Sequence, residues 1–258
     1  MVSRVPPWPP PPPATGAQQI PRDLVNHLAT LTVADEVVAA TDGGTGYGIS
    51  TWAIHIRHLR DGSMDVSKRP LGTWTAVVQG EDQSNWAAET AAASILLRAA
   101  RDSKTKATIR WVYDSKSVAD AIQKFQSTAR LGMETLLAHT ALLQCGSQGA
   151  VVTATWCTSH NKRFPSGWQP PAWADEFTLR ATNKVADDTC SATRDSYAAS
   201  TGRVDIDAKI NDAIAHTNNV FDLAGFVAVR WAKHSTKAAN STAGQEDGPP
   251  APIPIANA

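Results

Sequence analysis

The amino-acid sequence predicts an α/β fold, a five-stranded mixed β-sheet with helices on both faces. Short apolar runs bounded by turn residues alternate with helical patterns along the chain. Three of the expected strands come first and in direct succession, which is the order of an antiparallel meander. The later strands are separated by helices, which is the order of parallel βα units.

The three strands of the expected meander are each marked by their pattern or by a turn signal. Glu36 to Asp42 is a short apolar run closed by Asp-Gly-Gly, so we expect a buried strand that ends in a turn. Tyr47 to Arg57 alternates as a second strand does. A hairpin signal at Asp61 to Ser63 precedes a third strand over Gly72 to Gln79.

The strongest helical pattern of the chain follows, over Asn85 to Ala100, with Asp82 or Ser84 as the expected N-cap. The remaining expected elements are, in order, a strand, two helices, a strand and a helix: Ala107–Asp114, Ser117–Phe125, Leu131–Gln144, Ala150–Trp156 and Ala181–Thr193.

Composition divides the chain into four segments. Residues 1–30 contain a proline run and are expected to be disordered, and residues 31–198 hold the patterned domain. Residues 199–239 form a C-terminal extension that we expect to be helical, because Asn218 to His234 is moderately amphipathic. Residues 240–258 are rich in proline and small residues and are expected to be a disordered tail.

Charge and cysteine content narrow the function classes. The chain has 24 basic and 24 acidic side chains, which counts against a tight, free-standing nucleic-acid binder. Its three cysteines have no metal-type spacing, and an odd number argues against a disulfide framework, so a reducing intracellular compartment is expected. No apolar run approaches the roughly 20 residues of a membrane span. We therefore expect no membrane partner.

Four carboxylates occupy positions that favour metal binding. Asp42 and Asp114 each end an apolar strand, and ligands of open α/β sheets bind at that edge. Glu89 shares a helical stripe with alanines and leucine on the expected core face, where an unpaired carboxylate is costly. Asp187 shares a helical face with Asn183. Oxygen ligands of this kind suit hard divalent ions such as Mg²⁺ or Mn²⁺.

These residues lie in five motifs that together resemble the ribonuclease H family over Glu36 to Thr193. The motifs stand in the family's order, each on the element that the fold requires. They are TDGG (Thr41–Gly44), SNWAAETAAA (Ser84–Ala93), VYDSKSV (Val112–Val118), TWCTSH (Thr155–His160) and NKVADDTCSA (Asn183–Ala192).

The resemblance implies an endonuclease that hydrolyses the RNA strand of RNA–DNA hybrids by two-metal catalysis, leaving 5′-phosphate and 3′-hydroxyl ends. It implies two Mg²⁺ ions as cofactors, with Mn²⁺ as a substitute. Asp42 is expected to bridge both ions, and Asp187 to help hold the ion that activates water. Glu89 and Asp114 are expected to hold the ion at the leaving 3′-oxygen.

The resemblance also implies roles for residues around the metals. His160 corresponds to a mobile histidine that assists turnover and product release. Asn85 is expected to contact a ribose 2′-hydroxyl, and Asn183 to lie beside the cleavage site. Gly43 and Gly44 are expected to let the backbone approach the RNA strand closely.

Departures from the family pattern leave alternatives open. The long segment Asn161–Thr182 resembles insertions of retroelement-type members, which makes a reverse transcriptase domain of the same polyprotein a possible partner. Trp86 and Ala87 replace a polar pair, and a basic handle between the middle helices is missing. The alternatives are a DNA-acting nuclease of the same superfamily and a catalytically degenerate, nucleic-acid-binding connection domain. The Asn–Glu helix motif and the full set of four acids favour hybrid cleavage.

Overall fold

The computed structural model describes residues 17–61, 63–65, 67–80, 82–125, 132–159 and 162–202. All of these residues belong to one compact unit. The elements alternate much as the sequence predicts. In chain order they are α1 (Arg22–Ala29), β1 (Glu36–Gly46), β2 (Ile49–Arg60), β3 (Ser63–Met64), β4 (Gly72–Val77), α2 (Asn85–Ser103), β5 (Thr108–Tyr113), α3 (Lys116–Lys124), α4 (Met133–Ser147), β6 (Val151–Trp156) and α5 (Glu176–Ser200).

The strands form one mixed sheet in the order β3-β2-β1-β5-β6, with β4 also paired to β2. β3 and β4 pair with different parts of β2, so the sheet is five strands wide. β1, β2 and β4 are antiparallel, whereas β1, β5 and β6 are parallel. The predicted mixed sheet is confirmed.

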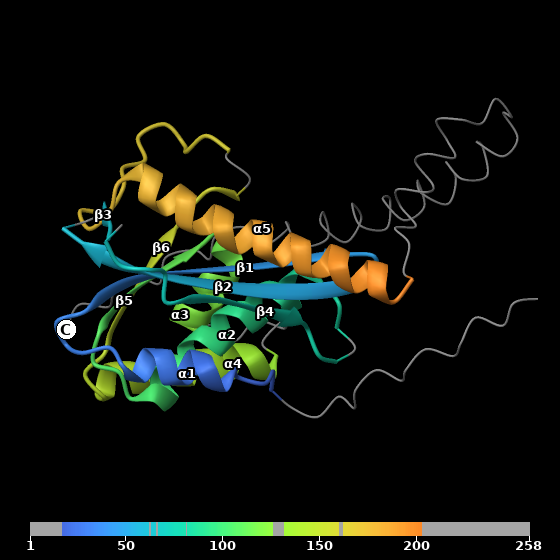
Figure 1. Cartoon of the computed structure of the whole chain (residues 1–258), viewed down its shortest axis with the longest axis horizontal. Helices are drawn as coiled ribbons and strands as arrows, with labels where there is room; N and C mark the ends of the chain where they lie inside the picture. Colours follow the sequence, from blue (N-terminus) through green and yellow to red (C-terminus); the bar gives the residue numbers. More distant parts are fainter. Residues whose placement is uncertain are drawn as a thin grey trace, which may run out of the picture. The chain divides into compact units, whose positions relative to one another are not determined.

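Helices cover both faces of this sheet, and each face has its own apolar core. Figure 1 shows α5 on one face and α1, α2 and α4 on the other. Side chains alternate along a strand. Val37 and Ala39 of β1 therefore join the core under α2, whereas Val38 and Ala40 join the core under α5.

Helix α1 lies in the segment that the sequence analysis assigned to a disordered N-terminus. Its Leu24 and Leu28 are fully buried in the core beside α2. The indole Nε1–H of Trp74 donates a hydrogen bond to Asp23 Oδ2 at 2.7 Å, which ties α1 to β4. The expectation of disorder over residues 1–30 is therefore wrong for residues 17–30, because two leucines one helical turn apart supply an apolar stripe.

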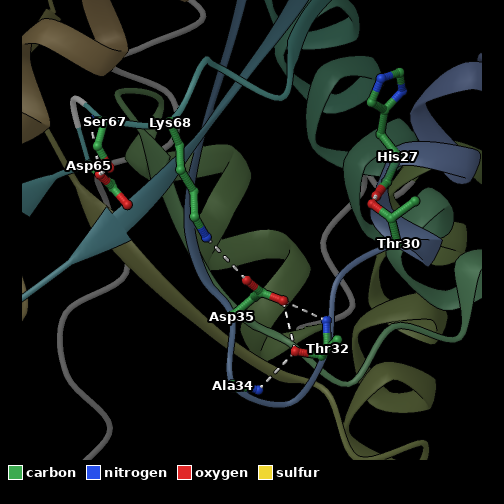
Figure 2. A network of polar contacts seen from close by, with 8 residues as sticks. All are labelled: His27, Thr30, Thr32, Ala34, Asp35, Asp65, Ser67 and Lys68. Carbon is green, nitrogen blue, oxygen red and sulfur yellow. Dashed lines mark hydrogen bonds and ion pairs between the residues drawn. The ribbon is translucent and has the colours of Figure 1, made fainter.

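A polar turn fixes the entry into β1 (Figure 2). The Asp35 carboxylate accepts hydrogen bonds from the Thr32 backbone N–H and hydroxyl, both at 2.8 Å, and these bonds lower the pKa of Asp35. Lys68 lies 3.6 Å from the same carboxylate. The Thr108 N–H donates to the Asp35 carbonyl at 3.0 Å, so the turn also sets β1 against β5.

β1 and α5 extend furthest beyond their expected bounds. β1 does not end at Asp42 but continues to Gly46, and its turn falls at Tyr47 and Gly48, which both have positive φ. α5 begins at Glu176 rather than Ala181, where the Asp175 side chain accepts from the Thr178 N–H at 2.6 Å. It extends to Ser200 through residues of moderate helix propensity, supported by packing on β1, β2 and β4.

The insertion before α5 packs aromatic side chains onto the same face as α5. Phe164 stacks on Trp168 with ring centroids 3.5 Å apart, and the Arg180 guanidinium lies over Phe164 at 4.6 Å. Both rings and Trp173 pack against the core that contains Cys157 and Leu179. The described part of this insertion thus extends the core of the sheet.

Several expectations concern residues outside the described part of the chain, namely the proline run, the tail 240–258 and all but the first four residues of the extension predicted over 199–239. All three cysteines are free and buried. Within the described ranges, no helix combines the length and apolar character required to span a membrane.

The contribution of α1 to stability is testable by Leu24→Ala. Truncating a fully buried leucine removes apolar contacts and leaves a cavity, so the free energy of unfolding should fall by about 2–5 kcal/mol. Chemical denaturation measures this change, and Asn26→Ala on the exposed face of α1 is the control, expected within about 0.5 kcal/mol of wild type. Equal stability of Leu24→Ala and wild type would contradict the packing of α1.

Candidate metal centre

Two of the four predicted acids meet at the carboxyl edge of parallel strands. Thr41 of β1 lies opposite Tyr113 of β5, so Asp42 and Asp114 follow at the same level on neighbouring strands. Asp42 is 6% exposed although it carries a carboxylate. The prediction that Asp42 and Asp114 lie close together is confirmed, whereas the prediction that Asp42 ends its strand is wrong, because β1 continues to Gly46.

Glu89 reaches this edge because α2 packs unusually close to β1. A Cβ on Gly43 would lie 2.3 Å from the Ala88 carbonyl carbon and the Glu89 nitrogen, so glycine is required there. Helix α2 begins at Asn85 with the Ser84 hydroxyl accepting from the Ala87 N–H at 3.1 Å. The Glu89 carboxyl is then one turn into the helix and hydrogen-bonds the Gly43 backbone.

The acids converge on one open cleft of about 480 Å³. One carboxylate oxygen from each of Asp42, Glu89 and Asp114 lies within 4.8 Å of the others. Asp187 of α5 lines the same cleft. The described lining residues are Asp42, Gly43, Gly44, Thr45, Asn85, Trp86, Glu89, Asp114, Ser115, Ser117, Ser159, Asp187, Ser191 and Arg194.

The electrostatics of the cleft disfavour four ionised carboxylates without a cation. Burial, followed by the charges of Asp114 and Asp187, raises the pKa of Asp42 to about 7. Burial and the charges of Asp114 and Asp42 raise the pKa of Glu89 well above its usual range. A divalent ion among these oxygens would replace repulsion by attraction. The donor set, made of carboxylate oxygens alone, fits Mg²⁺ or Mn²⁺.

The Cys190 side chain of α5 contacts Asp42. Its thiol is buried, contacts the Asp42 carboxyl, and lies 3.2 Å from the Thr51 carbonyl oxygen. The Thr51 hydroxyl donates to the Cys190 carbonyl oxygen at 3.0 Å. Burial and the Asp42 charge raise the pKa of the Cys190 thiol to about 12. The neutral thiol therefore links α5 to β1 directly behind the acid cluster.

The expected substrate residues are placed differently from one another. Gly43, Gly44 and Asn85 line the cleft, and the Thr45 hydroxyl donates a hydrogen bond to the Asn85 side-chain oxygen. Asn183 is 4% exposed and is not among the described lining residues, so its role beside the cleavage site stays a prediction. His160 lies outside the described residues.

Seven of the described residues that line the cleft were not predicted as site residues. They are Thr45, Trp86, Ser115, Ser117, Ser159, Ser191 and Arg194. A spacing signal was present for two of them. Ser191 and Arg194 follow Asp187 by one and two helical turns, so they share its face of α5. For Arg194 the signal was obscured because the helix was expected to end at Thr193.

The element order, the mixed sheet and the gathering of the acids at its carboxyl edge are those that the resemblance implied. The fold is ribonuclease H-like. No model of a known protein family matches the chain. No curated protein sequence matches it either.

Solved structures similar to this ribonuclease H-like chain include three of particular interest. The N-terminal ribonuclease H domain of a Mycobacterium tuberculosis protein is 16% identical, covering 65% of this chain and 99% of that one, with a TM-score of 0.43. LC11-RNase H1 in complex with an RNA/DNA hybrid is 15% identical, covering 62% and 98%, with a TM-score of 0.39. A foamy viral protease-reverse transcriptase in complex with double-stranded DNA is 12% identical, covering 63% and 94%, with a TM-score of 0.38.

Replacing Asp42 by Asn should stabilise the metal-free protein at neutral pH. Because the folded-state pKa of Asp42 is raised from 3.8 to about 7, the folded protein loses stability as pH rises between these values. Asp42→Asn should therefore match wild type near pH 4 and exceed it by a few kcal/mol at most at pH 7.5. Thermal melts in a metal chelator measure this, and millimolar Mg²⁺ should narrow the gap. A lower melting temperature of the variant at pH 7.5 would show that Asp42 is structural.

The close approach of α2 to β1 is testable with a pair of glycine variants. Gly43→Ala forces a Cβ against the α2 backbone and should cost about 3 kcal/mol or more, with failure to fold as the extreme. Gly44→Ala meets only the end of the flexible Arg194 side chain and should cost about 1 kcal/mol or less. Denaturation curves compare them, and equal losses would contradict this packing.

Proposed function

We propose that the chain is a divalent-metal-dependent endonuclease that hydrolyses the RNA strand of RNA–DNA hybrids. The observation that carries the proposal is the convergence of Asp42, Glu89 and Asp114 within 4.8 Å, with Asp187 on the same cleft. Four acids from β1, α2, α5 and the end of β5 meet there, although Asp114 raises the pKa of both Asp42 and Glu89. A structural cluster has no reason to keep such repulsion.

In this proposal Asp42, Glu89, Asp114 and Asp187 would together hold two divalent cations through their carboxylate oxygens. Bound ions would supply a deprotonated attacking water and neutralise the charge that develops on the leaving 3′-oxygen. The Gly43 backbone and the Cys190 thiol orient the Glu89 and Asp42 carboxyls. The products would carry 5′-phosphate and 3′-hydroxyl ends.

Selection of an RNA strand is assigned to the start of α2. Asn85 is exposed, lines the cleft, and accepts from Thr45 through its side-chain oxygen, which leaves its amide N–H groups for a ribose 2′-hydroxyl. Gly43 and Gly44 line the cleft beside Asn85 and carry no side chain, so the β1 backbone is accessible to the RNA strand there. His160 would assist turnover, and Asn183 would support the cleavage site from within α5.

The retroelement origin and a reverse transcriptase domain of the same polyprotein belong to the same proposal. They rest on the long insertion before α5 and on the neutral net charge, since a weakly charged nuclease domain benefits from a neighbouring domain that holds the hybrid.

The direct test uses a hybrid with a labelled RNA strand, the full chain and Mg²⁺ or Mn²⁺. Wild type should cleave the RNA strand, and Asp114→Asn should lower the rate by more than about 100-fold because a metal ligand is lost. Asp188→Asn is the matched control, because Asp188 is exposed, pairs with Lys184 at 2.7 Å and lies off the cleft.

The outcomes separate the proposal from its two alternatives. Cleavage of an all-DNA duplex under the same conditions would indicate a DNA-acting nuclease. Hybrid binding without cleavage of either strand would indicate a degenerate binding domain. Near wild-type cleavage by Asp114→Asn would show that the site assignment is wrong.

A further inference from the structure

We propose that Arg194 binds a phosphodiester of the substrate strand next to the one held at the acid cluster. This inference rests on the proposed function and adds a substrate contact to the same cleft. Arg194 lies on α5 two turns after Asp187, and it lines the cleft together with the four acids. Among the described lining residues it is the one that carries a positive charge.

The guanidinium of Arg194 lies directly over the end of β1. A Cβ on Gly44 would meet its Nη1 at 2.7 Å, and a Cβ on Gly46 would meet its Nε at 2.9 Å. These two glycines point toward α5, as Asp42 does, because side chains alternate along β1. The missing side chains of Gly44 and Gly46 thus form the slot that holds Arg194 beside the acids.

The side chain of Arg194 is oriented but retains free hydrogen-bonding capacity. Its Nη2 donates to the Ser191 hydroxyl at 3.1 Å, which holds the guanidinium along α5. Within the described ranges, none of the carboxylates lies within the 4.0 Å of an ion pair with it. An arginine has five N–H donors in a planar fork that matches two phosphate oxygens. Most of these donors are therefore available to a ligand.

Charge balance indicates that the Arg194 guanidinium pairs with a phosphate of the substrate rather than with the acids of the cleft. The charges of four carboxylates and two divalent ions cancel, so in a loaded centre the positive charge of Arg194, which otherwise acts on the Asp42 carboxylate, is available to the substrate. A phosphodiester carries one negative charge and accepts the two parallel hydrogen bonds that arginine offers. A strand whose scissile phosphate lies at Asp42 and Asp114 would pass its neighbouring phosphate over the end of β1.

The test compares the full-length wild type with Arg194→Gln in hybrid cleavage across 50–200 mM salt. The variant should raise KM about tenfold, which corresponds to one lost charge-assisted contact. The slope of log(kcat/KM) against log salt should become shallower by about 0.9, the value for one phosphate contact. Mn²⁺ affinity without nucleic acid, measured by calorimetry, should stay within about twofold.

Three further variants make the test specific. Gly46→Ala should displace the guanidinium, reproduce the effects of Arg194→Gln, and add nothing to them in the double variant. Arg194→Lys should restore the salt slope but not the KM, because it keeps the charge and loses the fork. Arg101→Gln removes the same charge from an arginine paired to Asp102 at the far end of α2, and its slope should equal that of wild type.

The inference fails if Arg194→Gln leaves KM and salt slope unchanged in a protein that cleaves the hybrid. It also fails if the variant changes Mn²⁺ affinity alone, since Arg194 would then be a counter-ion of the acids. Additive losses in the double variant with Gly46→Ala would overturn it as well. A wild type that neither binds nor cleaves the hybrid would instead defeat the proposed function, so the two failures are distinguishable.

Discussion

The candidate metal centre is shaped by the mutual repulsion of carboxylates that are wholly or partly buried. Asp42 and Glu89 are both held in places where water cannot fully solvate their charges, and each lies beside Asp114. In a metal-free protein the response is a raised pKa, which keeps part of the cluster protonated near neutral pH. A dication would replace that repulsion by attraction, and this is the physical reason for our proposal that the acid cluster binds one.

Three separate structural features bring the acids together. Parallel pairing of β1 and β5 sets Asp42 level with Asp114. The missing side chain of Gly43 lets α2 approach closely enough to bring in Glu89. On the opposite face, the buried Cys190 joins α5 to β2 through Thr51 and to β1 through Asp42, and Asp187 and Arg194 of α5 line the same cleft. The cleft therefore lies where α2 and α5, from opposite faces of the sheet, meet near the carboxyl ends of β1 and β5.

Much of this arrangement was predictable because strand ends and helix stripes leave a periodic trace. The acids of β1, α2 and β5 were predicted from that trace and from the ribonuclease H-like motifs. Two features were not predictable. Helix α1 is short and lies beside a proline-rich run, and its stability comes from burying Leu24 and Leu28 rather than from its own propensity. Arg194 lies beyond the expected end of α5, and only the tertiary contact with Gly44 and Gly46 places it in the cleft.

Proton release on metal binding shows whether the raised pKa values of the acid cluster belong to a cation site. Calorimetric titration of the wild type with Mn²⁺ at pH 6, repeated in buffers of different ionisation enthalpy, counts the protons displaced from the carboxyls. We predict binding in the millimolar range or tighter and proton release at pH 6, because the pKa of Asp42 is about 7 and that of Glu89 is also raised. The contribution of Asp42 to this release should fall as pH rises above 7. Mn²⁺ binding without any proton release at pH 6, or no binding at all, would contradict the account.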